Sequence, residues 1–287
     1  MHFAVLASPD SWYLRDLKRA AEGKHEITPI TYRELVARLD GPAPEFRSGP
    51  LDLRTVDALL VRTMPPGSLE QVVFRMDVLG RLEAAGVRVI NPARAIEAAV
   101  DKYLASAKLA AAGLATPRTV VCQTVDEAML GFTELGCDVV VKPLFGAEGR
   151  GIARLNDEAL AQRAFSLLVN LGAVLYLQEF IPHEGMDLRI LLIGDRTFGM
   201  QRRNPLDWRT NVSRGAAAEP LELTSELVEM ARRAAAAIGA PVAGVDLLPG
   251  LDDKLYAIEV NAVPGWQAIS RVTGVDMARE VLEFAAK

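Results

Sequence analysis

Cysteine and histidine are scarce in this sequence, with 2 Cys and 3 His among 287 residues. A structural zinc site needs several such ligands at short spacings, and Cys122 and Cys137 show no such pattern. Both cysteines stand in apolar contexts, so we expect buried thiols in a reducing compartment and no disulfide framework. The sequence therefore gives no support to a structural zinc centre.

The chain also lacks a strong charge of one sign and a long apolar run. Its 32 Lys and Arg and 37 Asp and Glu give a net charge of -5, which argues against nucleic acid as the main partner. No apolar run reaches the roughly 20 residues that a membrane span requires. The first residues, MHFAVLASPDSWYLRDL, contain no basic leader and are typical of a first strand. We therefore expect no signal peptide, no membrane partner and a cytoplasmic protein.

Short apolar runs alternate with helical patterns through the first 94 residues. Solid apolar runs are typical of a parallel sheet covered on both faces, so this part is predicted to be a small parallel α/β domain. The predicted strands are 3–8, 25–30, 56–62 and 87–92, the helices are 11–23 and 68–86, and 41–50 is a loop.

Two further units are predicted, at 95–173 and 174–287. The first begins with a helix at 93–113, which leads into the strand TPRTVVC, and continues with a helix at 124–136, a strand at 138–144 and a helix at 157–171. In the second we expect strands at 174–181, 188–193, 197–202, 242–248 and 254–261, a polar loop at 203–220, and helices at 223–239 and 274–286.

The stretch VVVKPLFGAEGRGIARL (139–155) presents Lys142 at the end of a buried strand, followed by glycines at 146, 149 and 151. Glycines let backbone amides approach a phosphate closely, and lysine supplies a positive charge. A hairpin turn between two strands explains the same pattern equally well. Lys102, upstream in a predicted helix, is either a second phosphate contact or a solvated surface lysine.

The strand YLQEFIP (176–182) loses its pattern at Pro182. Such an edge can hold a purine between apolar side chains, with backbone groups bonded to the ring, and Gln178–Ile181 would form it. A plain strand end is the alternative. Asp187 and Arg189 share one face of the next strand, and Arg202 closes the one after it. Arginines from adjacent strands offer a fork for carboxylate or phosphate.

Oxygen ligands appear near the end of the chain. Glu259 and Asn261 are two residues apart in YAIEVNAVPGW (256–266), so they point to the same face of a strand. If that strand pairs with GVDLLPG (244–250), Asp246 lies near both. Carboxylate and carboxamide oxygens suit magnesium, and a cation offsets the repulsion between two facing carboxylates. A polar strand end before a turn is the alternative.

Together these motifs resemble the ATP-grasp superfamily, and within it the RimK-type α-L-glutamate ligases. The resemblance covers nearly the whole chain and includes DKYLASAKLAAAGLATP at 101–117, VVKP, QEFI, D-x-R at 187–189, N-x-x-R-G at 211–215, GVD at 244–246 and E-V-N-x-x-P-G at 259–265. It implies an ATP-grasp fold, in which two α+β subdomains clasp ATP, preceded by a Rossmann-like domain.

The resemblance also assigns roles by position. Lys102 and Lys142 would contact the phosphates, and the loop Gly146, Ala147, Glu148, Gly149, Arg150, Gly151 would close over them. Gln178, Glu179, Phe180 and Ile181 would line the adenine site, and Asp187 would meet the ribose. Asp246, Glu259 and Asn261 would bind two magnesium ions, with manganese as an alternative. Arg189, Arg202, Asn211 and Arg214 would act at the γ-phosphate or the substrate carboxylate. Ala147 and Ala262 stand where relatives often have a hydroxyl residue, which removes side-chain contacts but not the backbone cradle.

The implied activity is an ATP-dependent carboxylate–amine ligase that forms an acyl phosphate and then an amide. The resemblance implies L-glutamate as the amine, and residues 61–87 are similar to members that modify tetrahydromethanopterin. It also implies a homo-oligomer. One alternative keeps the chemistry and changes the acceptor to a protein C-terminus, an amino acid or an amino-acid carrier. Another is a nucleotide-binding regulatory module without ligase activity.

Overall fold

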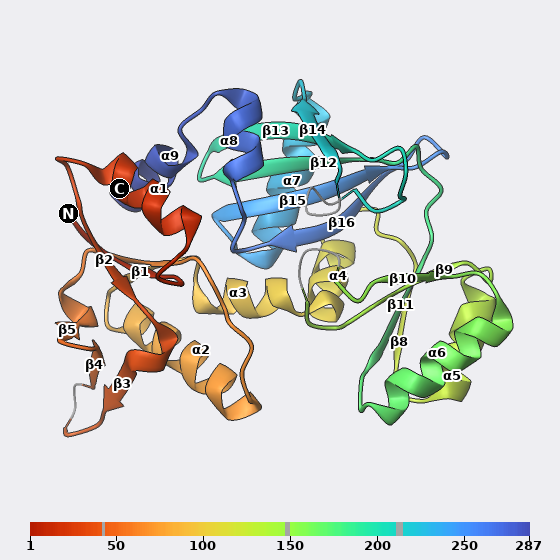
Figure 1. Cartoon of the computed structure of the whole chain (residues 1–287), viewed down its shortest axis with the longest axis horizontal. Helices are drawn as coiled ribbons and strands as arrows, with labels where there is room; N and C mark the ends of the chain where they lie inside the picture. Colours follow the sequence, from red (N-terminus) through yellow and green to blue (C-terminus); the bar gives the residue numbers. More distant parts are fainter. Residues whose placement is uncertain (42–43, 147–149, 211–214) are drawn as a thin grey trace.

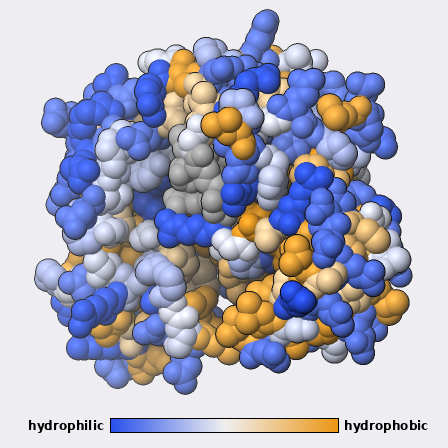
Figure 2. Space-filling view, turned by 45° about the vertical axis from the view of Figure 1, so that its right-hand side comes forward, coloured by the Kyte–Doolittle hydropathy of each residue, from blue (hydrophilic) through white to orange (hydrophobic). Residues whose placement is uncertain are grey.

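The computed structural model of the chain describes residues 1–41, 44–146, 150–210 and 215–287. Within these residues the strands form four sheets (Figure 1). No helix in the described part of the chain is long and apolar enough to cross a membrane. The face shown in Figure 2 is mostly hydrophilic with scattered hydrophobic patches, as is common for globular proteins.

The N-terminal sheet is parallel and has the strand order β2-β1-β6-β7. Its strands are β1 (His2–Leu6), β2 (Glu26–Ile30), β6 (Ala58–Val61) and β7 (Arg88–Ile90). Side chains alternate between the two faces, and a helix covers each face. Helix α1 (Trp12–Ala21) packs on the face of Phe3, and α2 (Leu69–Ala84) packs on the face of Leu6. The predicted parallel α/β arrangement is confirmed.

The middle sheet is antiparallel, with the order β10-β9-β11-β8. It contains β8 (Thr119–Cys122), β9 (Val139–Lys142), β10 (Ala153–Leu155) and β11 (Leu175–Glu179). Helices α5 (Val125–Glu134) and α6 (Glu158–Asn170) cover one face, where Phe132 and Phe165 meet edge to face at 6.5 Å between ring centres. The alternate residues, among them Lys142 and Gln178, therefore point to the other face.

The C-terminal sheet is also antiparallel and has the order β14-β13-β12-β15-β16. Its strands are β12 (Met186–Ile193), β13 (Arg196–Arg203), β14 (Ala217–Pro220), β15 (Val242–Pro249) and β16 (Leu255–Asn261). Helix α7 (Ser225–Ile238) packs on the face of Ile190. Helices α8 (Gln267–Thr273) and α9 (Met277–Ala285) pack on the opposite face, with Leu191.

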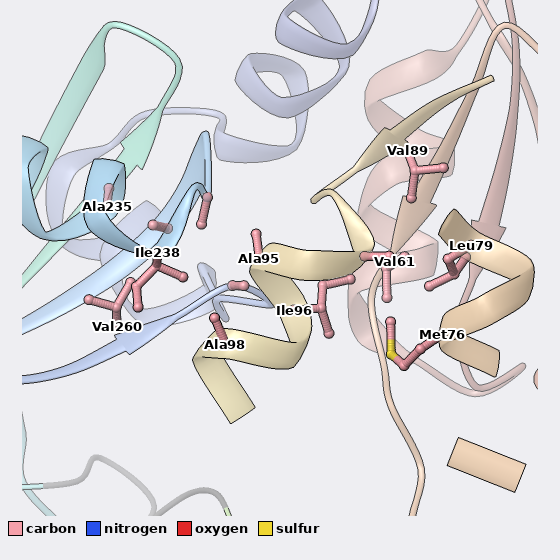
Figure 3. Packing of buried hydrophobic residues seen from close by; sticks show 14 of the residues in the cluster. Val61, Met76, Leu79, Val89, Ala95, Ile96, Ala98, Ala235, Ile238 and Val260 are labelled. Atoms are coloured by element: carbon pink, nitrogen blue, oxygen red, sulfur yellow. The ribbon is translucent and has the colours of Figure 1, made fainter. Parts of the chain in front are cut away.

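Helix α3 (Ala93–Val100) lies between the N-terminal and C-terminal sheets, and α4 (Lys102–Ala111) continues from it beside β16 (Figure 1). Figure 3 shows Ile96 of α3 near Val61 and Met76, with Ile238 and Val260 beyond it, and all five belong to one buried cluster. Helix α1 lies beside α9 (Figure 1), where the two ends of the chain approach each other. One apolar core thus joins the first and last parts of the chain. The domain boundaries at 94 and 173 stay predictions.

Several predicted elements were wrong. The predicted loop at 41–50 includes β4 (Glu45–Ser48), which pairs with β3 (Leu35–Arg38) and β5 (Leu51–Asp52) in a small sheet held by buried Phe46. The polar loop at 203–220 contains β14, and α8 was missed. The helix predicted at 93–113 is broken at Asp101, because its carboxylate accepts from Leu104 N at 3.0 Å and starts a new helix.

The prediction that both cysteines are buried was also wrong. Cys122 is half-buried and Cys137 is exposed. Cys137 lies three residues after the end of α5 and has a φ of 60°, and its N–H donates to Phe132 O at 2.9 Å. The residue therefore belongs to the turn that ends this helix, and its apolar neighbours Val139 and Val140 enter the sheet without it.

Asn91 is a buried polar residue, 2% exposed, that ties the end of β7 to the C-terminal sheet. Its amide donates to Val242 O at 2.6 Å and to Ala262 O, and it accepts from Val242 N at 2.9 Å. Asn91→Ala would leave these backbone groups buried without partners, which costs about 2–4 kcal/mol of unfolding free energy. Urea denaturation measures the loss. Asn170→Ala, at the exposed end of α6, is the control and should cost less than about 0.5 kcal/mol.

Candidate functional site

A cavity lies between the free face of the middle sheet and the C-terminal sheet. Helix α4 closes one side of it with Lys102 and Ser106. The two sheets contribute Val140, Lys142, Tyr176 and Gln178 from one and Asp187, Arg202, Asp246 and Glu259 from the other. The predicted phosphate contacts, the predicted adenine edge and two predicted metal ligands therefore line one cavity.

Lys142 is held by a chain of polar side chains beneath the cavity. Its Nζ donates to Gln178 Oε1 at 2.6 Å, and Gln178 Nε2 donates to Tyr176 OH at 3.1 Å. Tyr176 in turn shares a 2.7 Å hydrogen bond with Ser106. The pKa of Lys142 is lowered to about 8, mainly by burial; the attraction of Glu259 and Asp246 opposes this decrease, and the positive charge of Lys102 adds to it. Hydrogen bonds thus hold the Lys142 ammonium group in place, and the surrounding residues compensate its charge only in part.

Lys102 is the first residue of α4. Its Nζ donates to Gly146 O at 2.9 Å, which ties the start of the glycine loop to the helix. Burial lowers its pKa, although Glu259 and Asp101 favour the charged form. The two lysines therefore approach Glu259 from different elements. The break at Asp101, which the sequence did not predict, is what places Lys102 at a helix start.

The predicted adenine edge lines the same cavity, although its polar side chains are already engaged. The carboxylate of Glu179 accepts from Arg118 N at 2.7 Å and from Arg118 Nε at 2.6 Å. The ring of Phe180 lies under the guanidinium of Arg154 at 3.5 Å and meets Trp208 edge to face at 5.9 Å. Backbone groups and apolar surface, rather than the Glu179 carboxylate, are therefore what this edge offers a planar ring.

A buried ionic network crosses three strands beside the cavity. Arg202 pairs with Asp187, and its Nη2 also lies 3.1 Å from Asp246 Oδ2. Arg189 makes a two-point contact with Asp246, including 2.8 Å from Nη2 to Oδ2. Burial works against the charge of Asp246, but Arg189 and Arg202 outweigh it and lower its pKa. For Asp187, burial prevails over Arg202 and raises the pKa. Arg202 itself is 5% exposed and is engaged in this network, and it also lines the cavity.

The strand register confirms the pairing expected for the oxygen ligands. Asp246 is directly opposite Glu259, and Gly244 is opposite Asn261. No hydrogen bond or ion pair engages the Glu259 carboxylate within the described residues, whereas Asn261 Oδ1 accepts from Val263 N at 2.8 Å. No cluster of three His, Cys, Asp or Glu side chains suited to a metal occurs in the described ranges. Of the three predicted ligands, Glu259 offers a carboxylate without a hydrogen bond or ion pair among the described residues, whereas Asp246 is bound by Arg189 and Arg202 and Asn261 Oδ1 keeps one lone pair for a magnesium ion that also takes water and phosphate. The metal assignment stays a prediction.

A second cavity, of about 620 Å³, lies on the other side of Glu259, among β16, α3, α8 and the end of β6. Arg189, Gly146 and Asn261 line it, and Glu259 and Arg202 line both cavities. It also contains side chains that the sequence analysis missed, namely Tyr13, Arg62 and Arg271.

Arg62 follows the buried strand β6, where the carboxyl end of a parallel sheet presents its ligand-binding residues, so its position was a usable signal. Its guanidinium lies 4.1 Å from the Trp266 ring centre and 5.0 Å from that of Tyr13, and Nη2 donates to Pro264 O at 2.6 Å. Burial lowers its pKa to about 10. Arg271 gave no signal, because helix α8 was not predicted.

Some predicted residues lie outside the described part of the chain, namely Ala147, Glu148, Gly149, Asn211 and Arg214. Gly151 is described and has a φ of 70°, where a Cβ would stand 2.9 Å from Pro143. This position therefore suits glycine. The roles of Arg150, Gly151 and the residues outside the described ranges stay predictions.

Comparison with known proteins gives an independent result. The family model of the RimK-like ATP-grasp domain matches residues 99–285. The tetrahydromethanopterin:α-L-glutamate ligase of Methanosarcina acetivorans is 33% identical over 98% of this chain and 97% of its own, and that of Methanocaldococcus jannaschii is 35% identical over 99% and 97%. A probable α-L-glutamate ligase of Trichodesmium erythraeum is 31% identical over 100% of this chain and 96% of its own.

The fold also matches solved structures. The ATP-grasp ligase PsnB, complexed with a minimal precursor, Mg and ADP, has a TM-score of 0.77 and 21% identity, and the match covers 99% of this chain and 96% of that one. The predicted ATP-grasp fold is confirmed.

The lowered pKa of Lys142 predicts a pH dependence for nucleotide binding. Only the protonated lysine attracts phosphate, so affinity for ADP without magnesium should fall as pH rises through about 8. Calorimetry in EDTA should show binding about tenfold weaker at pH 9 than at pH 7. Lys142→Met should bind weakly at both values with little pH dependence. An unchanged pH dependence in that variant would assign the titration to another group.

Proposed function

The chain belongs to the RimK-like ATP-grasp family, so it is an ATP-grasp ligase that forms carbon–nitrogen bonds, and we propose that it joins L-glutamate to the carboxylate of a cofactor such as tetrahydromethanopterin. The observation that supports this most is the position of Glu259, which lines both cavities. A phosphate donor in the first cavity and a carboxylate acceptor in the second would meet at this residue.

In the proposed reaction, an acceptor carboxylate oxygen attacks the γ-phosphorus of ATP, and ADP leaves. The amine of glutamate then attacks the acyl carbon, and phosphate leaves as the amide forms. Magnesium bound by Asp246, Glu259 and Asn261 would neutralise charge on the transferred phosphoryl group. We assign two ions to this site, in line with the resemblance. No side-chain nucleophile is needed, so positioning and electrostatic stabilisation are the contributions of the protein.

The chain's own residues fit these tasks. Lys102 and Lys142 would hold the phosphates from α4 and β9. Arg189 lines the acceptor cavity and would stabilise the oxyanion that forms at the acyl carbon. Glutamate carries two carboxylates, and Arg62 and Arg271 provide further positive charge in the same cavity. Family membership and the presence of both lysines and all three oxygen ligands argue against a regulatory module without ligase activity.

Replacing Glu259, which lines both cavities, tests the proposal. Glu259→Gln keeps the size of the side chain but removes its charge, so ADP formation should fall at least about 100-fold while the circular dichroism spectrum stays unchanged. A coupled assay of ADP release measures this. Glu222→Gln, at an exposed position of the same sheet unit, should retain full activity. Normal turnover in Glu259→Gln would contradict the role of Glu259.

The identity of the substrates needs a separate experiment. Purified protein with ATP, magnesium and tetrahydromethanopterin should release ADP in large excess over the enzyme only when glutamate is also present. With isotope-labelled glutamate, mass spectrometry should find the label in the pterin product. Incubation with a cell extract, separated into small molecules and proteins, compares the acceptors directly. Label in the protein fraction alone would favour a protein-modifying ligase. No label in either fraction would remove glutamate as the amine.

A further inference from the structure

A third cavity, of about 680 Å³, opens in the N-terminal unit. Its lining comes from the residues after β1, β2 and β6 and from the first turns of α2, and includes Ser8, Tyr32, Thr63, Phe74 and Arg75. Thr63 also lines the second cavity, so the two spaces adjoin at this residue. The activity assigned above does not use this third cavity.

Topology explains why a pocket forms here. In the order β2-β1-β6-β7, the chain leaves β1 toward β2 on one side and reaches β6 on the other. Helix α1 packs on one face of the sheet and α2 on the opposite face. The connections therefore diverge at the carboxyl ends of β1 and β6, which leaves a crevice of the kind that holds ligands in parallel sheets.

Tyr32 gives an independent sign that a ligand belongs there. The residue is only 7% exposed, and its hydroxyl is buried without a hydrogen-bond partner in the described part of the chain. An unpaired buried hydroxyl is unfavourable, so a partner from a ligand would remove a cost that folding alone leaves in place. A tyrosine hydroxyl is protonated at neutral pH and can donate, and burial raises the pKa of Tyr32 further above neutrality.

The other lining groups favour a flat ring rich in hydrogen-bond acceptors. Phe74 is 41% exposed although it is a large apolar side chain, and Arg75 lies 5.3 Å from the ring centre of Tyr32. Aromatic rings and a guanidinium offer surfaces for stacking. Arg33 adds a second cation, and no carboxylate occurs among the described residues that line this cavity, so a positively charged ligand is disfavoured.

We propose that this cavity binds the bicyclic, nitrogen-containing ring of the acceptor, and that the carboxylate arm passes Thr63 to reach the junction at Glu259. This rests on the proposed function, because it assigns the ring end of the same acceptor. The acceptor would thus extend along the N-terminal unit, with Tyr32 donating to a ring oxygen or nitrogen and Phe74 packing against the ring.

A pterin ring without a carboxylate arm tests the cavity alone. Wild-type protein should bind 6-hydroxymethylpterin saturably in a fluorescence titration. Phe74→Ala should weaken binding about tenfold, and Tyr32→Phe about fivefold, because they remove a packing surface and a hydrogen bond. Tyr32→Phe should not lower the melting temperature, since the lost hydroxyl has no partner among the residues that the structure describes. Arg81→Ala, exposed on the same helix and away from the cavity, is the matched control.

Kinetics separate this inference from the proposed function. With tetrahydromethanopterin as acceptor, both cavity variants should raise the acceptor KM by similar factors and leave kcat and the KM values for ATP and glutamate unchanged. Ring binding that is sensitive to these variants without amide formation would support the cavity and overturn the proposed acceptor. The cavity assignment would be overturned if the protein forms the amide but does not bind the pterin ring. It would also be overturned if neither variant changes ring binding or the acceptor KM. If the protein neither binds the ring nor forms the amide, the cavity assignment and the proposed acceptor would both be overturned.

Discussion

A buried set of charges holds the C-terminal sheet in the form that both cavities require. Arg202 pairs with Asp187 and Arg189 with Asp246, and Arg202 also reaches Asp246, so that two cations and two anions share one enclosed region. Removing such charges from water is costly, and only mutual pairing with good geometry compensates for it. Loss of one member would leave an unpaired buried charge. The network therefore fixes the relative positions of β12, β13 and β15 at the end where the cavities meet.

The alternation of side chains along the strands brings the residues of this network onto one face of the sheet and places Glu259 beside them. Asp187 and Arg189 share a face, Arg202 is opposite Asp187, and Asp246 is opposite Arg189. Glu259 is then opposite Asp246, and two carboxylates directly across a strand pair repel each other. The two arginines already balance Asp246, so Glu259 can stand beside it with its carboxylate directed at other partners. Asn91, bonded to both Val242 and Ala262, fixes the far end of the same two strands.

The sequence was most informative where a charged residue occurs near the end of an apolar strand. Lys142, Asp246 and Glu259 were found because each sits near the end of an apolar strand, and pairing of β15 with β16 followed from the short turn between them. Arg62 could have been found by the same rule. The break at Asp101 was hidden because alanine-rich sequence continues on both sides, and only the capping contact reveals it. The sheet around Phe46 and helix α8 depend on tertiary packing that local patterns do not report. Tyr32 could not be found, since an unpaired hydroxyl exists only in the folded structure.

The charges around Glu259 explain which ligands this site would favour. The two arginines and two aspartates of the ionic network pair with one another, whereas Glu259 faces Lys102 and Lys142, with Asp101 also close to Lys102. Burial lowers the pKa of both lysines, so their positive charges are held at a cost. Polyphosphate with magnesium would supply negative charge to the lysines and positive charge to the oxygen ligands at once. Each ligand thereby makes the other more favourable. In the proposed function, phosphate and magnesium would therefore be selected together by electrostatic complementarity, and the acceptor carboxylate would lie beside Arg189 in the second cavity.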